Sequence, residues 1–268
     1  MSHSQNHRLA LSSRVVGRVR SKIKRLLIVF LGCLILVLVF LGLVGRAYWV
    51  PSASMVPTLL VGDVVFVTKY SFGWRPSSLP VRFARLDGLA VAPKLPKRGD
   101  IVVLRKPSSG NQTPNSLVIK RVIGLPGDDV RLISGRLEIR TKPVSLFPLI
   151  GQDVGTYHQD VEESAYFRET LPAGLTDDEE MPASYVIRDR GMTRDDNFGP
   201  FTVPDRQLFL LGDNRDNSED SRTAVLSVVP VDNLIGRAQF VLLSIRNSKE
   251  RSSSVFPFRI DRFFKPLQ

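Results

Sequence analysis

Two serines, Ser52 and Ser54, stand between two prolines in residues 50–59, which read VPSASMVPTL. Proline fixes its own φ angle and restrains the residue before it, so Pro51 and Pro57 predict a stiff segment that runs extended and then turns. A nucleophilic hydroxyl needs this rigidity, because attack fails when the reacting atoms are even slightly misplaced. An ordinary turn between prolines fits the same residues, so the segment alone leaves a nucleophile and a turn both open.

A lysine and an arginine interrupt an apolar run in residues 116–123, SLVIKRVI. Burial in a strand of this kind lowers the pKa of an amine, since a low dielectric disfavours the charged form. A neutral lysine can act as a general base. Side chains alternate between the two faces of a strand, so a buried Lys120 predicts that Arg121 faces solvent. The opposite arrangement, with Arg121 buried and Lys120 in solvent, also fits the pattern.

A dense polar segment, LGDNRDNSEDSR at residues 211–222, follows an apolar run. It could be a turn held by hydrogen bonds among Asp, Asn and Arg. Its carboxylates also suggest a calcium loop, but the required spacing of oxygen ligands, with glycine at the sixth position, is missing. A nucleotide-binding glycine motif is missing as well. The sequence therefore predicts neither a metal nor a cofactor.

The histidines and the cysteine narrow the alternatives further. Of the three histidines, His3 and His7 lie in a polar N-terminal tail. A Ser-His-Asp triad would therefore have to use His158, and a zinc site with several histidines is disfavoured. Cys33 is the single cysteine, so an intramolecular disulfide is excluded.

The segments that must position these groups read as short β-strands. Runs rich in β-branched residues, separated by turns with Pro, Gly or Asp, predict strands at residues 64–69, 101–105, 117–123, 130–133, 136–140, 208–211 and 238–243. No long amphipathic helix and no internal repeat accompany them. The sequence therefore predicts a mostly β fold with an antiparallel catalytic domain.

A run of 20 residues without a charge, LLIVFLGCLILVLVFLGLVG, occupies residues 26–45. As a helix it would span about 30 Å, the thickness of the hydrocarbon core of a bilayer. A buried core helix of this length would normally carry a polar stripe, and a cleaved signal peptide would be shorter and end in a small-x-small site. The residues that follow, RAYW at 46–49, instead contain two aromatics suited to a membrane interface. We therefore expect one transmembrane helix at 26–45.

The formal net charge of +11 is concentrated at the N-terminus. Of the 37 basic residues, seven lie in residues 1–25, which hold no acidic residue, and this leaves 30 basic against 26 acidic residues elsewhere. The positive-inside rule makes 1–25 a cytoplasmic tail and places 46–268 outside the plasma membrane. A basic tail can also bind nucleic acid, but the adjacent apolar run favours the lipid bilayer, so we expect no nucleic-acid partner.

Two stretches look inserted between the strands. Residues 71–98 mix Pro and Arg with large apolar residues, which suits a loop on the membrane surface as well as an ordinary surface loop. Residues 142–192 are acidic and irregular, and their run Asp177-Asp178-Glu179-Glu180 predicts a solvated face or a flexible segment.

Together these segments resemble the bacterial type I signal peptidases, also called leader peptidases. PSASMVPTL at 51–59 is similar to the box of that family that holds the nucleophilic serine, and KRVIGLPGD at 120–128 is similar to the box that begins with its lysine base. Four further boxes match in the order of the family: KRGDIVVL at 97–104, FGPFTVP at 198–204, GDNRDNSEDSR at 212–222 and VPVDNLIGRA at 229–238.

The resemblance implies a membrane-bound serine endopeptidase that removes signal peptides from exported pre-proteins. It implies that Ser54 is the nucleophile, that Lys120 is a neutral general base, and that the Ser52 hydroxyl joins the Ser54 N–H in the oxyanion hole. It also implies that Ser218 orients the Lys120 amine, and that Asp220 and Arg222 form a buried pair that supports the same wall of the active site.

The resemblance also implies how the substrate binds. The signal peptide would lie extended against residues 50–54 and 117–119, with pockets that admit only small side chains at the first and third positions before the cut, the A-x-A pattern. The implied lining residues are Val50, Pro51, Met55 and Ile119. The implied fold carries a variable β insertion at about residues 136–206.

Two other interpretations stay open. A related Ser–Lys protease with a narrower task, such as the processing of pilin-like precursors, would carry the same boxes. A catalytically silent β-domain that only binds could keep the fold, although intact Ser54, Lys120 and Ser218 speak against it. Ser–Lys autoproteases of the repressor type share the chemistry but lack a membrane anchor.

Overall fold

The computed structural model describes residues 22–37, 39–40, 44–73, 92–107, 116–140, 142–148, 165–171, 183–246 and 256–267. The chain divides into two compact units, Met1–Val44 and Gly45–Gln268, and each is described by itself. Most of the loop predicted at 71–98, the acidic run Asp177–Glu180 and His158 lie outside the described residues.

In the first unit, residues 22–37 and 39–40 are helical and their side chains are exposed. Within the described ranges, no helix is both long enough and apolar enough to cross a membrane. Residues 38 and 41–43 of the predicted span lie outside the description. The predicted end of that span is wrong, because Gly45 begins a strand, where a Cβ would lie 2.6 Å from the Phe66 ring on the neighbouring strand.

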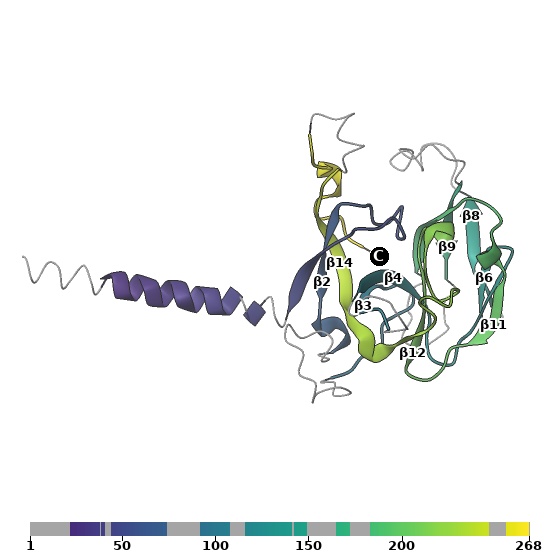
Figure 1. The fold of residues 1–268 in the computed structure, drawn as a ribbon, viewed down its shortest axis with the longest axis horizontal. Coiled ribbons are helices and arrows are strands. Elements are labelled where there is room, and N and C mark those ends of the chain that lie inside the picture. The colour runs from purple at the N-terminus through teal and green to yellow at the C-terminus, as the bar shows by residue number, and fades with distance from the viewer. Residues whose placement is uncertain are drawn as a thin grey trace, which may run out of the picture. The chain divides into compact units, whose positions relative to one another are not determined.

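Seven antiparallel strands form the large sheet of the second unit, in the spatial order β1-β2-β14-β3-β4-β12-β13 (Figure 1). Their bounds are β1 Gly45–Trp49, β2 Asp63–Thr68, β3 Ile101–Arg105, β4 Leu117–Gly124, β12 Gln207–Leu211, β13 Val229–Pro230 and β14 Leu234–Ser244. Strand β4 lies between β3 and β12, so it is hydrogen-bonded on both edges. The lysine and arginine predicted to lie in a strand are therefore on an interior strand of this sheet.

Two smaller antiparallel sheets are built from residues between β4 and β12. One has the order β11-β5-β6-β7, with bounds Phe198–Thr202, Asp129–Ile133, Arg136–Ile139 and Lys142–Pro143. The other has the order β10-β9-β8, with bounds Ser184–Asp189, Ala165–Thr170 and Ser145–Pro148. Figure 1 shows both on the side of β12, away from β1 and β2. Single-turn 3₁₀ helices occur at Tyr70–Phe72, Arg194–Asp196, Arg215–Asn217, Val231–Asn233 and Ile260–Arg262.

The core consists of three apolar clusters. The first joins β4 and β12 to the two small sheets through Ile123, Phe209 and Leu211. The second lies beneath residues 50–59, the serine segment, and contains Met55 and Leu59 together with residues of β2, β3 and β14. The third packs β3, β4 and β12 against residues 226–234, around β13. The large sheet thus carries the serine segment and the small sheets on separate apolar clusters.

The mostly antiparallel β fold predicted from the sequence is confirmed. All seven predicted strands are present, six of them with ends within one residue of the prediction, whereas β14 starts four residues earlier. The irregular structure predicted for 142–192 is wrong in part, because β7 to β10 lie there. Strands β7 and β8 were missed because they have only two and four residues, and β9 and β10 because they carry charged residues, as in AYFRET and SYVIRD.

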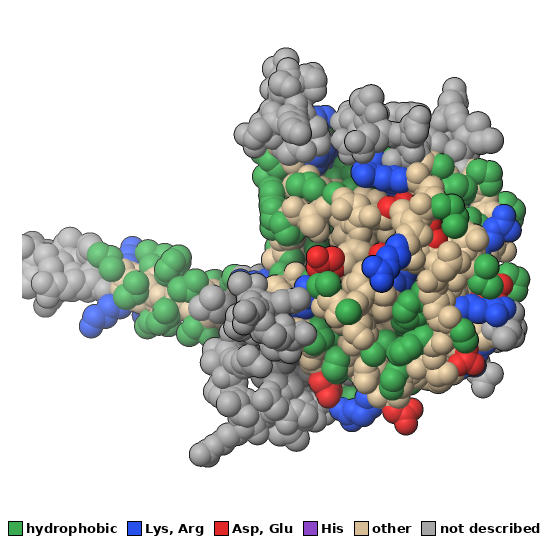
Figure 2. Space-filling view, turned by 45° about the vertical axis from the view of Figure 1, so that its right-hand side comes forward, with side chains coloured by type: hydrophobic (Ala, Val, Ile, Leu, Met, Phe, Trp, Pro, Cys, Tyr) green, Lys and Arg blue, Asp and Glu red, His purple; other side chains and the backbone are tan. Residues whose placement is uncertain are grey.

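The surface of the second unit mixes both signs of charge. On the face shown in Figure 2, Lys and Arg side chains are interspersed with Asp and Glu side chains and with apolar ones. This agrees with the nearly balanced charge of residues 26–268 and contrasts with the basic sequence at the N-terminus.

Candidate active site

The serine segment is held rigidly from both sides. Its own turn is closed by hydrogen bonds from Val56 N to the Ala53 carbonyl (3.1 Å) and from Leu59 N to the Met55 carbonyl (2.8 Å). Asn214, in the polar segment after β12, donates its backbone N–H to the Ser54 carbonyl (3.1 Å) and its side-chain amide to the Ala53 carbonyl (3.0 Å). Because Met55 is buried beneath the turn, the Ser54 side chain is presented outward from a fixed backbone.

Lys120 lies on β4 opposite Val102 of β3 and is buried, with 3 % of its surface exposed. Desolvation lowers the pKa of its amine from 10.5 to about 8, although the carboxylates of Asp220, Asp213 and Glu219 act in the opposite direction. Loss of hydration outweighs attraction to these carboxylates. About a tenth of the amine is therefore neutral at pH 7 and can accept a proton, far more than for an exposed lysine.

Arg121, which the alternation of the strand predicted to face solvent, is buried as well, with 1 % exposed. Alternation does place it on the face of β4 opposite Lys120, but the small sheets cover that face. Its guanidinium pairs with both carboxylate oxygens of Asp213, at 2.8 and 2.7 Å, and donates to the Gly99 carbonyl at 2.7 Å. The prediction of an exposed Arg121 is thus wrong, because both faces of β4 are packed.

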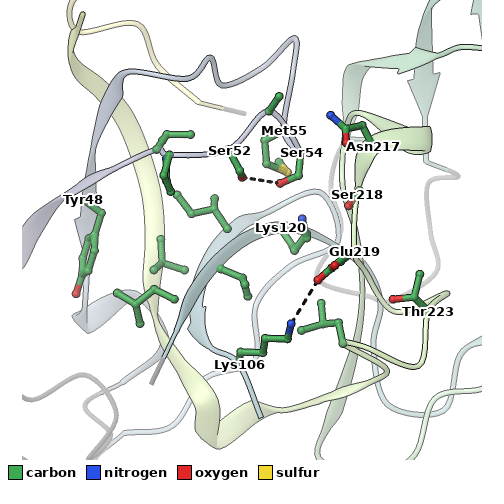
Figure 3. A pocket seen from close by; sticks show the side chains of 18 of the residues that line it. Tyr48, Ser52, Ser54, Met55, Lys106, Lys120, Asn217, Ser218, Glu219 and Thr223 are labelled. Carbon is green, nitrogen blue, oxygen red and sulfur yellow. Dashed lines mark hydrogen bonds and ion pairs between the residues drawn. The ribbon is translucent and has the colours of Figure 1, made fainter. Parts of the chain in front are cut away.

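A cavity of about 550 Å³ brings the predicted groups together. Figure 3 shows the side chains of Ser54, Lys120 and Ser218 directed toward one another from three separate segments of the chain. The Ser52 hydroxyl lies 3.4 Å from the Ser54 hydroxyl. The remaining predicted lining residues, which extend the cavity along the serine segment and β4, are Val50, Pro51, Met55 and Ile119.

Ser218 has a buried hydroxyl that forms no hydrogen bond within the described residues. Ser218, which the family resemblance implies to orient the lysine, therefore forms no hydrogen bond with the Lys120 amine in this structure. Gly212 lets Ser218 approach the serine segment, because a Cβ at this position would lie 2.2 Å from the Ser218 hydroxyl and 2.6 Å from the Ser54 carbonyl.

Asp220 and Arg222 form a buried pair behind this wall. The guanidinium contacts both carboxylate oxygens of Asp220 at 2.9 Å. The same carboxylate accepts a hydrogen bond from Gly212 N at 3.1 Å. Neither residue lines the cavity, and the pair contacts the backbone of Gly212 and Arg215 in the segment that carries Ser218.

Sequence reasoning missed residues that secure the serine segment to the polar segment. Thr58 donates its hydroxyl to Asp213 at 2.5 Å, and Asn214 holds the backbone of Ala53 and Ser54. All three are in the matched boxes, but a pattern does not say which polar residue contacts which. Leu117, Val118 and Lys106 also line the cavity. Within the described ranges, no group of His, Cys, Asp or Glu is arranged to hold a metal ion.

Comparison with known proteins places this arrangement in a family. Residues 23–243 match the family described as signal peptidase, peptidase S26. The signal peptidase I of Rickettsia typhi is 39% identical over 221 residues, which covers 81% of this chain and 78% of that protein. The signal peptidase I of Rickettsia felis is 39% identical over 211 residues, covering 76% and 73% of the two chains.

A solved structure of a signal peptidase I from Enterococcus faecalis is also similar, with 24% identity and a TM-score of 0.30 over 54% of this chain and 97% of that one. The family assignment rests on the family match and on the rickettsial relatives. The chain belongs to the signal peptidase I family, peptidase S26, and is thus a serine peptidase that removes signal peptides.

Proposed function

We propose that this peptidase is a membrane-bound endopeptidase in which Ser54 is the nucleophile and Lys120 the general base. The observation that supports this assignment is the cavity itself. It gathers a serine on a rigid turn, a buried lysine with a pKa of about 8 and a serine whose buried hydroxyl has no hydrogen-bond partner in the described part of the chain. A hydroxyl near an amine whose lowered pKa lets it take up a proton is the arrangement that a serine nucleophile requires.

In the proposed mechanism, the Ser54 hydroxyl attacks the scissile carbonyl while the neutral amine of Lys120 takes its proton. The tetrahedral oxyanion receives hydrogen bonds from the Ser54 N–H and the Ser52 hydroxyl, and one such donor stabilises a transition state by about 3–4 kcal/mol. The lysine then returns the proton to the leaving amine, and a water molecule activated by the same amine hydrolyses the acyl-enzyme.

The substrate would bind as an extended strand. The serine segment and the start of β4 flank the cavity, so a peptide between them can use main-chain hydrogen bonds for affinity and side-chain pockets for specificity. Val50, Pro51, Met55 and Ile119 give these pockets apolar walls. Small residues at the first and third positions before the cut, as in A-x-A signals, are the expected preference.

The apolar sequence at residues 26–44, behind a basic tail, supports anchoring of this enzyme in the plasma membrane with its catalytic unit outside. An anchored enzyme and a signal peptide in the same bilayer meet at a raised effective concentration. The lipid bilayer and the signal peptides of exported pre-proteins are then its two partners.

A direct test compares the parent protein with Ser54→Ala and Lys120→Ala variants on a pre-protein whose signal ends in A-x-A. Cleavage after that site by the parent, and by neither variant, is the expected result. Equal cleavage by all three would contradict the roles of Ser54 and Lys120. Circular dichroism of each purified variant controls for loss of folding.

A further inference from the structure

A buried ion pair connects a small sheet to the polar segment of the candidate site. Glu169 on β9 accepts a hydrogen bond from Arg215 Nη1 at 2.9 Å, and a second contact joins Arg215 Nη2 to the other carboxylate oxygen. The side chains of the two residues are only 2% and 1% exposed. Tyr185 on β10 donates its hydroxyl to the same carboxylate at 2.6 Å. Both carboxylate oxygens of Glu169 are thus engaged away from solvent.

One route leads from this ion pair to the wall that carries Ser218. The Arg215 carbonyl accepts a hydrogen bond from Arg222 Nη2. Arg222 forms an ion pair with Asp220, and the carboxylate of Asp220 accepts a hydrogen bond from Gly212 N. Gly212 lies close to Ser218 and to the serine segment, since a Cβ added to it would lie 2.2 Å from the Ser218 hydroxyl and 2.6 Å from the Ser54 carbonyl. Arg215 therefore contacts Arg222 through its carbonyl, while its guanidinium is held by Glu169.

A second route leads from Tyr185 to the serine segment. The Arg121 guanidinium lies 4.0 Å from the centre of the Tyr185 ring. Arg121 pairs with Asp213, and Asp213 accepts the hydroxyl of Thr58, four residues after Ser54. The backbone of β10 also contacts Asp213, since Arg188 N donates a hydrogen bond to the Asp213 carbonyl at 2.7 Å. The two routes thus reach the two sides of the cavity from one small sheet.

We propose that Glu169 and Tyr185 are positioning residues for the cleavage reaction, through which the small sheet β8–β10 sets the relative placement of Ser54, Lys120 and Ser218. This inference rests on the function proposed above. A buried ion pair adds little stability compared with well-packed apolar residues. It does, however, fix the orientation of both side chains. Neither residue lies in the boxes that resemble the family, and neither lines the cavity.

The test measures kcat and KM of full-length protein in detergent micelles with a peptide that carries an A-x-A site. Glu169→Gln keeps the shape of the side chain but removes the charge that holds Arg215. We expect kcat to fall by between about tenfold and a hundredfold, as slight misplacement of reacting groups does, while KM stays within about twofold. Glu138→Gln is the matched control, because Glu138 pairs with Arg131 on the other small sheet, and it should leave both constants unchanged.

A pair of variants at Tyr185 gives an independent test that does not depend on the folding of Glu169→Gln. Tyr185→Phe keeps the ring beside Arg121, whereas Tyr185→Leu removes it, so Tyr185→Phe should retain more of the parent kcat. Equal kcat in these two variants would overturn the role of the ring. Unchanged kcat in folded Glu169→Gln, or an equal loss in Glu138→Gln, would overturn the role of the carboxylate.

Failure of this inference is distinct from failure of the proposed function. A parent that cleaves the peptide, with activity lost in Ser54→Ala, retains the proposed function whatever the Glu169 and Tyr185 variants do. A parent without cleavage overturns the proposed function and, with it, the reaction that these residues are inferred to support. Thermal unfolding of every variant separates a loss of folded protein from a loss of rate.

Discussion

At the scale of the residue, burial has different consequences for two neighbouring basic residues on β4. Lys120 and Arg121 are both buried, yet the lysine pKa falls to about 8 while the arginine is bound by the carboxylate of Asp213. Lysine can lose its proton when it is desolvated, whereas a guanidinium stays charged and therefore needs a partner. The chemistry of the site depends on which of the two faces the cavity.

The lowered pKa of Lys120 predicts how the rate of cleavage depends on pH. The amine must be neutral to act as a base, and with a pKa of about 8 only about a tenth of it is neutral at pH 7. We therefore expect kcat/KM to rise with pH through a limb near 8 and then to level off. A series of kcat/KM measurements from pH 6 to pH 10 would show this limb, and a rate independent of pH over that range would contradict a lysine base.

At the scale of the element, β4 links the serine segment to the small sheets through the ion pair of Arg121 and Asp213. Both side chains of this pair are buried, and Asp213 also accepts a hydrogen bond from the Thr58 hydroxyl. A buried charge left without its partner costs several kcal/mol, whereas an exposed ion pair contributes little. The stability of this junction therefore depends on the pair remaining complete.

Asp213→Asn is expected to lower the free energy of unfolding by about 3–5 kcal/mol, because it leaves the Arg121 guanidinium buried without a counter-charge. Asp232→Asn serves as the control, since its pair with Arg206 is largely exposed and should contribute less than about 1 kcal/mol. Urea unfolding followed by circular dichroism would measure both. Equal losses in the two variants would show that Arg121 finds other compensation.

Five of the seven strands of the large sheet could be predicted from sequence, whereas β1, β13 and all three strands of the sheet β8–β10 could not. Strands such as Ile101–Arg105 are runs of buried apolar residues, so their composition is informative. Strands β9 and β10 bury only some of their side chains and include Glu169, whose partner Arg215 lies 46 residues away. Pairing at such a distance depends on tertiary packing, which no local pattern encodes.

The candidate site was predicted in the same uneven way. Ser54, Lys120 and Ser218 are marked by their boxes, and the structure places all three around one cavity. The burial of Arg121 was missed, because strand alternation says which residues share a face but not whether both faces are covered. The contacts of Thr58 and Asn214 were missed for a related reason, since they join segments distant in sequence.

At the scale of the whole molecule, the chain consists of two compact units, residues 1–44 and 45–268. Strand β1 begins at Gly45 and pairs with β2, so removal of residues 1–44 leaves the large sheet complete. A protein of residues 45–268 should therefore fold and cleave a short soluble peptide at a rate close to that of the parent.

The same truncation should weaken cleavage of a pre-protein embedded in lipid vesicles, because the proposed anchor raises the effective concentration of enzyme at the membrane. Flotation of each protein with vesicles gives the accompanying measurement of binding. If residues 45–268 bind vesicles and cleave the embedded pre-protein as well as the parent does, residues 1–44 are not the anchor.

The most direct test of the proposed catalytic roles is to locate the acyl group that the enzyme forms. The protein is treated with a serine-directed acylating inhibitor and digested, and the modified residue is identified by mass spectrometry. We expect one adduct, on Ser54, which is absent from Ser54→Ala and greatly reduced in Lys120→Ala because the hydroxyl is then not activated. An adduct on another residue, or one that forms equally well without Lys120, would contradict the Ser54–Lys120 mechanism.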